Sequence, residues 1–247
     1  MSAFEVRPSR VTRAAAGRHL RKGVTLVEML VALAILGILV ALTAAATSAA
    51  RSRGRAVRCL SNLRQWGVAF LLYADDHESF LPRRGQGVQP LWRLDRPEDW
   101  FNALPPYLGL PPYADLAANS RRPKAHEDSV FVCPSAEDPG DDVFLAYGMN
   151  MNLSPWNLAQ PTRLSDIQEP SKVVALGDAR GDYSSIYPSR QPYSPVARHS
   201  GRVNLLFLDG HAQAFTGADA GCGVGDPRCF DIHWLTGTKS DANADAY

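Results

Sequence analysis

An uncharged apolar block lies close to the N-terminus of the chain. From Met29 to Ala46 no side chain carries a charge, and Leu, Ile, Val and Ala dominate from Val24 to Ala44. An α-helix rises about 1.5 Å per residue, so about 20 residues cross a hydrocarbon core of ~30 Å. Residues 24–46 are therefore predicted to form a transmembrane helix.

Apolar residues continue at helical spacing beyond this block. They recur three or four residues apart, which places them on one face of a helix: Val57, Leu60, Leu63, Trp66, Phe70 and Tyr73. No proline interrupts the chain before Pro82 once the apolar block has begun. The pattern predicts one helix of about 50 residues, with residues 47–79 as an amphipathic half that packs on a domain.

The second half of the chain contains β-prone segments. Three of them are short and apolar: residues 130–134, 145–150 and 172–177. The strongest pattern joins residues 202–208 to residues 211–215 through Asp209-Gly210. Because Asp-Gly suits a two-residue hairpin turn, we predict a hairpin at the centre of an antiparallel sheet.

The predicted elements define an α+β fold. A long N-terminal helix, its first half transmembrane, packs on the antiparallel sheet of a globular head at residues 80–235. Within the head, residues 100–104 are predicted to form a short helix ended by Pro105-Pro106. Residues 236–247 are small and polar, and we predict a disordered tail.

The charge of the chain is unevenly distributed. Residues 1–23 form a basic arm with one acid, Glu5, and six basic residues: Arg7, Arg10, Arg13, Arg18, Arg21 and Lys22. The whole chain has a net charge of +1, whereas the chain without residues 1–23 has 20 Lys and Arg against 24 Asp and Glu, or −4. Binding of nucleic acid by the whole protein is therefore not expected.

The junction of arm and block carries a motif. Lys22-Gly23 precedes Val24-Thr25-Leu26-Val27-Glu28 and the apolar helix, which resembles the class III signal of type IV prepilins and type II secretion pseudopilins. The resemblance implies that a prepilin peptidase of the bacterial inner membrane cleaves between Gly23 and Val24 and methylates the new N-terminus. Residues 1–23 would then be the leader. This chain has Val24 where the family prefers Phe.

Glu28 is a carboxylate just inside the apolar block. A charge inside a membrane segment costs roughly 2.5–3.5 kcal/mol on insertion scales, so Glu28 needs a partner. Cleavage after Gly23 makes Glu28 the fifth residue of the mature chain, and the resemblance implies that it pairs with the α-amino group of Val24 on a neighbouring subunit. The resemblance also implies a cytoplasmic N-terminus and a periplasmic head.

A second resemblance concerns the head. Nine residues separate His199 from Asp209-Gly210, a spacing similar to a C-terminal signature of large pilin-like families with a class III signal. Three further segments resemble the same families: Cys59-Leu60-Ser61-Asn62-Leu63-Arg64-Gln65, Phe131-Val132-Cys133-Pro134 and Pro170-Ser171-Lys172.

Three interpretations of the histidine and the Asp-Gly turn stay open. In the first, Asp209 shapes its turn and His199 hydrogen-bonds loop backbone. In the second, Asp178, His199, Asp209 and His211 bind a divalent cation, zinc or calcium, with zinc favoured by two imidazoles because calcium prefers oxygen donors. In the third, His199 is a general base oriented by Asp209, although no nucleophile motif accompanies the pair.

The four cysteines permit three disulfide pairings. Cys222 and Cys229 bracket a turn-rich loop, and a bridge there would fix the C-terminal region in a compartment that permits disulfides. Cys59 and Cys133 are a second pair, which would tie the helix to the head.

The prepilin resemblance implies a structural, non-enzymatic subunit anchored in the inner membrane by a single span. Its partners would be prepilin peptidase and other pilin or pseudopilin subunits, in a type IV pilus or a type II secretion system. The alternative is a membrane-tethered periplasmic protein that binds metal or hydrolyses a substrate and uses the class III signal only for export. The sequence does not choose between pilus and secretion, or between a major and a minor subunit.

Overall fold

The computed structural model describes residues 23–85, 93–138, 140, 143–155, 159–188, 193–223 and 227–238, without the side chains of residues 44–46. Residues 1–22 of the predicted leader and residues 239–247 of the predicted tail lie outside the described residues. The chain divides into two compact units between Thr47 and Ser48.

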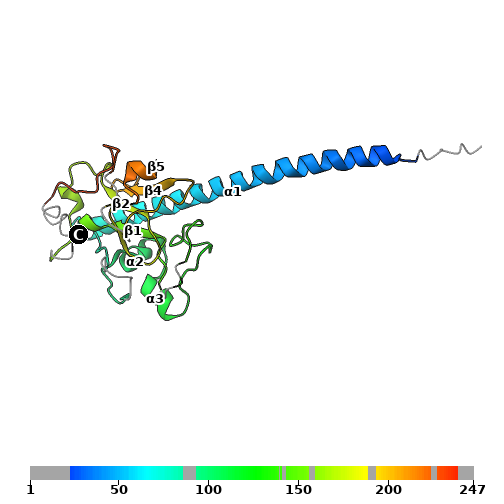
Figure 1. The fold of residues 1–247 in the computed structure, drawn as a ribbon. Coiled ribbons are helices and arrows are strands. Elements are labelled where there is room, and N and C mark those ends of the chain that lie inside the picture. Colours follow the sequence, from blue (N-terminus) through cyan, green and yellow to red (C-terminus); the bar gives the residue numbers. More distant parts are fainter. Residues whose placement is uncertain are drawn as a thin grey trace, which may run out of the picture. The chain divides into compact units, whose positions relative to one another are not determined.

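A long helix, α1, runs from Leu26 to Asp76, as the apolar pattern predicts (Figure 1). In the first unit its large apolar side chains, from Leu26 to Leu42, are all more than half exposed. Within the described part of the chain, α1 is the one helix long and apolar enough to cross a membrane. The uncovered surface of residues 26–42 therefore needs lipid or other apolar helices around it.

The second unit contains a five-stranded sheet in the order β3-β1-β2-β4-β5. The strands are β1 (Tyr147–Asn150), β2 (Val174–Asp178), β3 (Ser185–Ile186), β4 (Arg202–Phe207) and β5 (Ala212–Thr216). Neighbouring strands are antiparallel except for the short edge strand β3, which pairs with β1 in parallel. The α+β fold with a long N-terminal helix is confirmed, and its sheet is mixed.

The predicted hairpin forms, but its position and turn differ from the prediction. It lies at one edge of the sheet, because β2 occupies the centre and β5 has no further neighbour. The loop has three residues, Leu208 to Gly210: Phe207 N–H donates to His211 C=O, and Gly210 N–H donates to Phe207 C=O. Gly210 alone in the loop has a positive φ, +90°, so the turn is a three-residue loop closed by a left-handed glycine.

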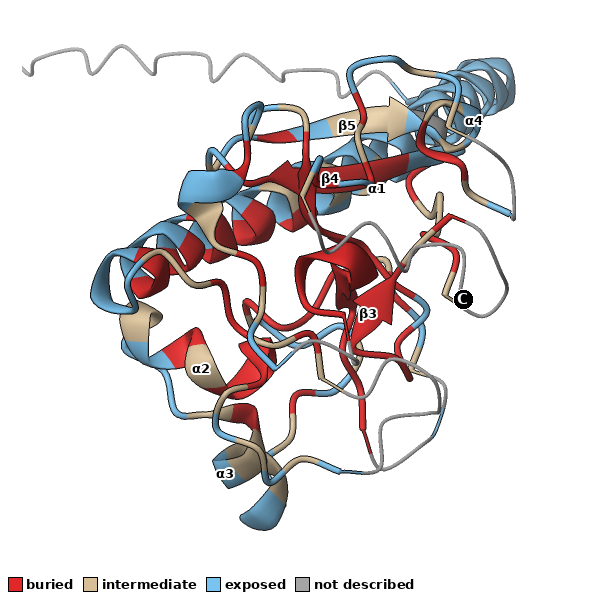
Figure 2. Cartoon of the chain, turned by 90° about the vertical axis from the view of Figure 1, so that its left-hand side faces the viewer, coloured by how far each residue is buried: buried red, intermediate tan, exposed pale blue. Residues whose placement is uncertain are grey.

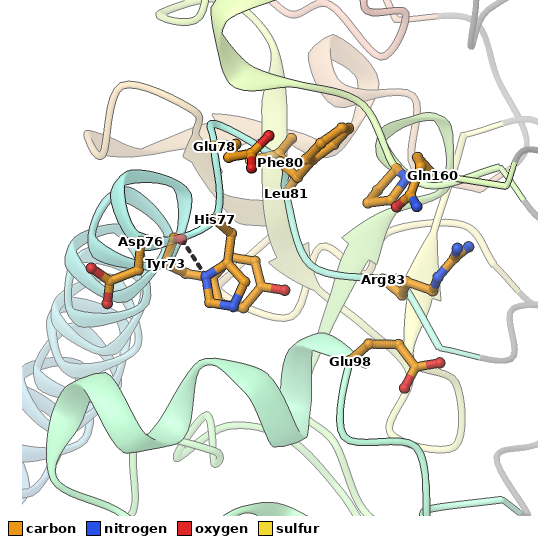
Figure 3. Close-up of a pocket in the computed structure, with 10 residues that line it drawn as sticks. Tyr73, Asp76, His77, Glu78, Phe80, Leu81, Arg83, Glu98 and Gln160 are labelled. Atoms are coloured by element: carbon orange, nitrogen blue, oxygen red, sulfur yellow. Dashed lines mark hydrogen bonds between the residues drawn. The ribbon is translucent and has the colours of Figure 1, made fainter.

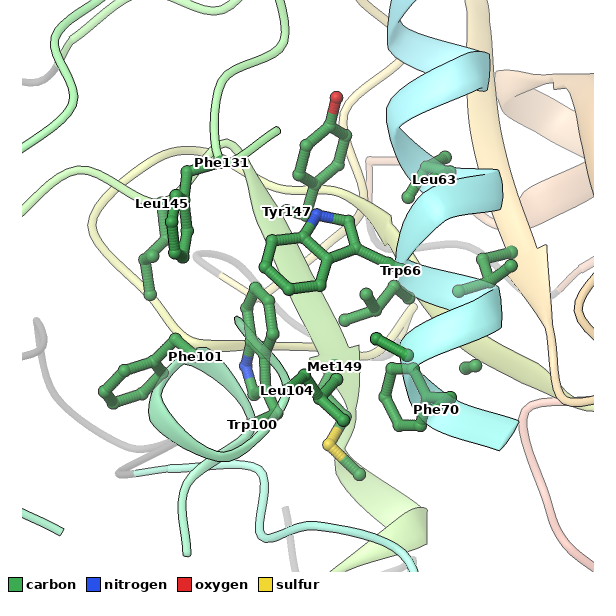
Figure 4. Close-up of a cluster of buried hydrophobic side chains, with 14 of the residues drawn as sticks. Leu63, Trp66, Phe70, Trp100, Phe101, Leu104, Phe131, Leu145, Tyr147 and Met149 are labelled. Carbon is green, nitrogen blue, oxygen red and sulfur yellow. The ribbon is translucent and has the colours of Figure 1, made fainter. Parts of the chain in front are cut away.

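Trp66 is the centre of the core between α1 and the rest of the head (Figure 4). Its ring meets the rings of Trp100 and Phe131 edge to face, with centroids 5.5 and 5.2 Å apart. Its indole N–H donates to the carbonyl of Val130 at 3.0 Å. Aromatic pairs of this geometry add about 0.5–1.5 kcal/mol each to the free energy gained by burial.

The buried side of α1 is set by the predicted periodicity from Leu63 onward (Figure 2). Val57, predicted on this side, is 65% exposed, and the neighbouring Cys59 is completely buried. The core therefore begins at Cys59, a residue that helical spacing alone did not select.

Residues 130–134 were predicted as a strand, and this prediction is wrong. The segment is buried but forms a turn outside the sheet. Two of its carbonyls accept from side chains of α1, because Trp66 donates to Val130 and Asn62 donates to Val132. The helix thus supplies the hydrogen bonds that a neighbouring strand would otherwise supply.

Short helices and the C-terminal segment complete the head. The helices are α2 (Trp100–Ala103), which confirms the predicted short helix, α3 (Tyr113–Ala118) and α4 (Gly217–Ala220). A second apolar cluster contains Leu205 of β4 together with Ile232 and Trp234 of the C-terminal segment. The side chains of Asn150 and Asn152 hold this segment by donating to Trp234 C=O at 2.9 and 2.8 Å.

Gly67 allows the hairpin to approach α1, and this contact gives a first prediction. A Cβ at Gly67 would lie 2.8 Å from the Gly210 carbonyl oxygen and 2.9 Å from Leu206 Cδ1. We expect Gly67→Ala to lower the free energy of unfolding by about 1–3 kcal/mol, because backbone would have to move. Urea unfolding of the detergent-solubilised protein, followed by tryptophan fluorescence, measures this.

The matched control is Gly54→Ala, on the same helix, where a Cβ would meet no atom within 4 Å. This variant should be as stable as the wild type or up to about 1 kcal/mol more stable, since alanine favours helix. Equal stabilities of the two variants would contradict the close contact at Gly67.

Asp99, just before α2, is a completely buried carboxylate that gives a second prediction. Within the described residues neither of its oxygens accepts a hydrogen bond, and Arg96 Nε lies 3.6 Å from Oδ1. Burial raises the pKa of Asp99 from 3.8 to about 7, although Arg96 opposes the rise. Because the folded-state pKa exceeds the unfolded one, ionisation of Asp99 opposes folding as pH rises from about 4 to about 7.

We expect Asp99→Asn to be more stable than the wild type above pH 7, by on the order of 2–4 kcal/mol. The difference should shrink as pH falls, since both side chains are then neutral. Unfolding curves collected across this pH range measure it. Asp95→Asn, at an exposed position nearby, is the control, and a similar pH dependence in that variant would refute the assignment to Asp99.

Candidate functional site

Thr25 and Glu28 form a reciprocal cap at the start of α1. Thr25 N–H and its hydroxyl both donate to Glu28 Oε2 at 2.8 Å, and Glu28 N–H donates to Thr25 Oγ1 at 3.2 Å. This is a capping box, in which two helix-end donors are satisfied by side chains. Glu28 thus has a local partner within its own chain, and both bonds fall on one carboxylate oxygen.

A buried cluster in the second unit joins Cys59, Cys133, Asp178 and His199. One ligand atom from each residue lies within 4.8 Å of the others. Among the described residues, this is the one group of three or more His, Cys, Asp or Glu side chains with the geometry to hold a metal ion.

Four separate parts of the fold bring the cluster together. Cys59 lies on the buried face of α1, and Cys133 follows the turn whose carbonyls α1 binds. Asp178 ends β2, and His199 lies in the short loop that enters β4, where it pairs with Arg202. Because each donor belongs to a different segment, the cluster exists only when the head is folded.

The contacts inside the cluster are short. Cys59 Sγ donates to Asp178 Oδ1 at 3.2 Å, Cys133 Sγ lies 3.3 Å from His199 Nε2, and His199 Nε2 lies 3.5 Å from Asp178 Oδ2. The two thiols and the carboxylate are completely buried, and the His199 side chain is 4% exposed.

Neighbouring groups orient the cluster. Asn204 N–H donates to Asp178 Oδ2 at 2.8 Å, and Arg198 Nε lies 3.8 Å from Asp178 Oδ1. The Tyr147 hydroxyl donates to Cys59 Sγ at 3.4 Å. Arg198 is itself held by the carbonyl of Ala179.

The cluster shifts the ionisation of its own members. Burial lowers the pKa of His199, but its bonds with Asp178 and Cys133 outweigh burial and raise the pKa to about 9. A hydrogen bond from Cys59 lowers the pKa of Cys133, burial raises it, and the bond with His199 lowers it further, to about 6. Burial raises the pKa of Cys59 well above its usual value. The Cys133 thiol is therefore the one that loses its proton most readily, which suits it to bind a cation.

The predicted metal ligands divide into two places. Asp178 and His199 lie in the buried cluster, whereas Asp209 and His211 lie at the hairpin turn. His211 Nδ1 is 2.6 Å from Asp209 Oδ1, and its ring stacks on Phe207 with centroids 4.4 Å apart. Asp209 also accepts from His211 N–H at 3.0 Å, so it shapes the turn, as the first interpretation expected.

All four cysteines of the chain are described, and all four are free thiols. The predicted bridge between Cys222 and Cys229 is therefore not formed in the structure, and both side chains are partly buried against the second apolar cluster. Burial raises the pKa of Cys222 to about 12.

The C-terminal end of α1, with Tyr73 and Asp76, lines a pocket together with the residues that follow it (Figure 3). His77 stacks on Tyr73 with ring centroids 3.8 Å apart, and Tyr107 donates to Asp76 at 3.0 Å. Glu78 pairs with Arg163. These side chains each have a different partner, as expected of a solvated helix end.

Cys59 and Cys133 were not among the predicted metal ligands, although they belong to the group that could hold a metal ion. The pattern contained a usable indication, because three of the four segments that resemble pilin-like families each contain a cysteine or histidine of the cluster. Those three segments together contain Cys59, Cys133 and His199, which are three of the four members of the buried cluster.

Comparison with known proteins identifies one region. A family model for the prokaryotic N-terminal methylation motif matches residues 18–44. No curated protein and no solved structure matches the chain. The motif spans the predicted cleavage site and the start of α1, so the class III signal of prepilin type is supported. The C-terminal His and Asp-Gly signature stays a prediction.

The motif implies processing by a prepilin peptidase and assembly with other pilins. Together with the apolar half of α1 it indicates a membrane-anchored chain with a single span. At this level the motif supports a type IV pilin-like or pseudopilin-type subunit.

Proposed function

We propose that the chain is a structural subunit of a type IV pilus or a type II secretion pseudopilus, cleaved after Gly23 and N-methylated at Val24. The observation that carries the proposal is the methylation motif at residues 18–44, placed directly on a helix whose apolar side chains are uncovered. Cleavage after Gly23 would remove the leader just before this helix, and the helix would then be free to serve both as a membrane anchor and as an assembly surface.

The exposed surface of α1 supports assembly through helices. In the first unit the large apolar side chains of α1 from Leu26 to Leu42 are uncovered, and lipid would cover them before assembly. In the second unit, Val57, Val68 and Leu72 remain 65, 53 and 45% exposed on the helix. Packing against the same helix of other subunits would cover both stretches, with van der Waals contact as the main attraction in the apolar part.

Glu28 would set the register of that packing. Both hydrogen bonds from Thr25 fall on Oε2, which leaves Oε1 able to accept from the α-amino group of Val24 on a neighbouring subunit. An ammonium and a carboxylate stabilise each other strongly where water is excluded. The cap and the intersubunit pair are thus compatible in one side chain.

In this function the N-terminus is cytoplasmic before cleavage and the head is periplasmic. The partners are prepilin peptidase, the inner membrane and other pilin or pseudopilin subunits. The chain itself would carry out no catalysis.

The alternative function is a membrane-tethered periplasmic protein that binds metal or hydrolyses a substrate. The buried cluster favours its metal-binding form. Burial of all four side chains speaks against hydrolysis, because a catalytic metal keeps one position open to water or substrate.

Processing provides the third prediction. In a host with a prepilin peptidase, intact-mass analysis should find a chain that begins at N-methylated Val24. Gly23→Val should keep residues 1–23 attached, since the peptidase needs the small residue at the cut. Gly37→Val, another uncrowded glycine of the same region, is the control and should be processed. A wild-type chain that begins at residue 1 in the presence of the peptidase would refute processing.

The fourth prediction concerns Glu28. We expect Glu28→Ala to reduce the yield of assembled fibre at least about tenfold, because an intersubunit charge pair is worth several kcal/mol once water is excluded. Quantitative blotting of sheared fibres measures the yield, and circular dichroism checks the fold. Asp75→Ala, an exposed acid on the same helix, should assemble normally.

Thr25→Val separates the two roles of Glu28. It removes the hydroxyl of the cap but keeps the carboxylate, so fibre yield should stay within about fivefold of wild type, as loss of one cap costs only ~1 kcal/mol. Equal loss in Thr25→Val and Glu28→Ala would mean that Glu28 acts only as a helix cap. A head activity that persists in a non-assembling Glu28→Ala chain would favour the membrane-tethered alternative.

A further inference from the structure

We propose that Cys59, Cys133, Asp178 and His199 form a structural zinc site that fastens α1 to the head. The four donors come from α1, the turn after residue 130, the end of β2 and the entry to β4. They lie close together although Cys59 and Asp178 are 119 residues apart in the sequence, and Cys133 and His199 are 66 apart.

The donor set selects the metal. Two thiolates and an imidazole are ligands that zinc accepts with tetrahedral geometry, and a carboxylate completes the set. Calcium is excluded by its preference for six or more oxygen ligands. The proposed zinc site is separate from the Asp-Gly turn, where the Asp209 carboxylate and the His211 imidazole already contact each other.

The spacing of the donor atoms fits a tetrahedron around zinc. With zinc–ligand distances of about 2.0–2.3 Å, the edges of a tetrahedron are about 3.3–3.8 Å long. Three contacts within the cluster, of 3.2, 3.3 and 3.5 Å, are close to these edges, and all four ligand atoms lie within 4.8 Å of one another. Small side-chain movements would therefore admit the ion without rearranging the backbone.

Charge balance gives an independent argument. With zinc bound, Cys59, Cys133 and Asp178 contribute three negative charges, His199 is neutral, and zinc contributes two positive charges. Arg198, whose side chain is 8% exposed and whose Nε lies 3.8 Å from Asp178 Oδ1, contributes the third positive charge. The buried site is then neutral, which avoids the high cost of an uncompensated charge in the interior.

The surroundings resemble the outer shell of a metal site. Asp178 is held by Asn204 N–H and by Arg198, and Cys59 accepts from the Tyr147 hydroxyl. Such contacts orient ligands before the metal arrives. Because no ligand is exposed enough to leave a position for substrate, the ion would be structural and would act as a cross-link between helix and sheet.

A disulfide between Cys59 and Cys133 is the competing outcome. In an oxidising compartment two neighbouring thiols can be joined, with two protons and two electrons removed by the thiol oxidant of that compartment. The disulfide and the zinc site exclude each other, because a thiolate that binds zinc is no longer available for oxidation.

The test uses the full-length protein in detergent, purified without chelator and without a histidine tag. Elemental analysis should find one zinc per chain. His199→Gln and Cys133→Ser should each lose at least about nine tenths of the zinc, as expected when one of four ligands is removed. The matched controls, His211→Gln and Cys229→Ser, lie outside the cluster and should retain it.

A second measurement covers ligand variants that fail to fold. Wild-type protein stripped with a chelator should take up one Co²⁺ and show the visible absorption of tetrahedral cobalt with a thiolate-to-cobalt charge-transfer band. Adding Zn²⁺ should abolish both bands and raise Tm by at least about 10 °C over the stripped protein. Wild-type protein that binds neither ion, or a peptide map in which Cys59 and Cys133 are joined, would overturn the proposal.

Discussion

The constraint on which the structure depends is that one continuous helix faces two kinds of surroundings. From Leu26 to Leu42 the large apolar side chains of α1 are uncovered, and from Cys59 to Tyr73 one side is covered by the head. In both stretches the helix satisfies its own backbone hydrogen bonds. The side chains alone therefore decide whether a stretch suits an apolar environment or the head. A helix of 51 residues is far longer than the ~11–12 residues of an average helix.

The side chains and the glycine on the buried face of α1 determine how the neighbouring segments of the head pack. Trp66 and Asn62 donate hydrogen bonds to carbonyls of the turn at residues 130–132, and Gly67 leaves room for the hairpin loop. The helix therefore supplies hydrogen bonds and space as well as apolar surface. Backbone around the sheet is also satisfied by the C-terminal segment, since Val174 N–H of β2 donates to the His233 carbonyl.

Periodicity predicts the elements that depend on local pattern. The length of α1, the short helix after Asp99, and strands β1, β2, β4 and β5 all follow from apolar spacing and turn residues. The segment at Val130–Cys133 has the composition of a strand, but its partners are side chains more than 60 residues earlier in the chain, which no local pattern contains. The position of β2 at the centre of the sheet is likewise a matter of long-range pairing.

The candidate sites differ in the same way. The Thr25–Glu28 cap and the cleavage junction each consist of residues that are close together in the sequence, so the sequence suffices to find them. The buried cluster needs four segments to meet, and the sequence supplied only two of its members, Asp178 and His199, together with two residues of the hairpin that belong elsewhere. Asp209 and His211 were grouped with Asp178 and His199 through the spacing of His199 and the Asp-Gly turn, but in the structure they contact each other at that turn, away from the cluster.

Both sites follow from one physical rule, that a charge removed from water must have a partner. At Glu28 the partner is local: Thr25 occupies Oε2, and Oε1 remains for a cation brought by another subunit. At Asp178, Arg198 and the proposed zinc would together balance the carboxylate and two ionised cysteines. The proposed zinc at Asp178 and the proposed ammonium beside Glu28 are two solutions to one problem. The first would make the head rigid within a subunit, and the second would join one subunit to the next.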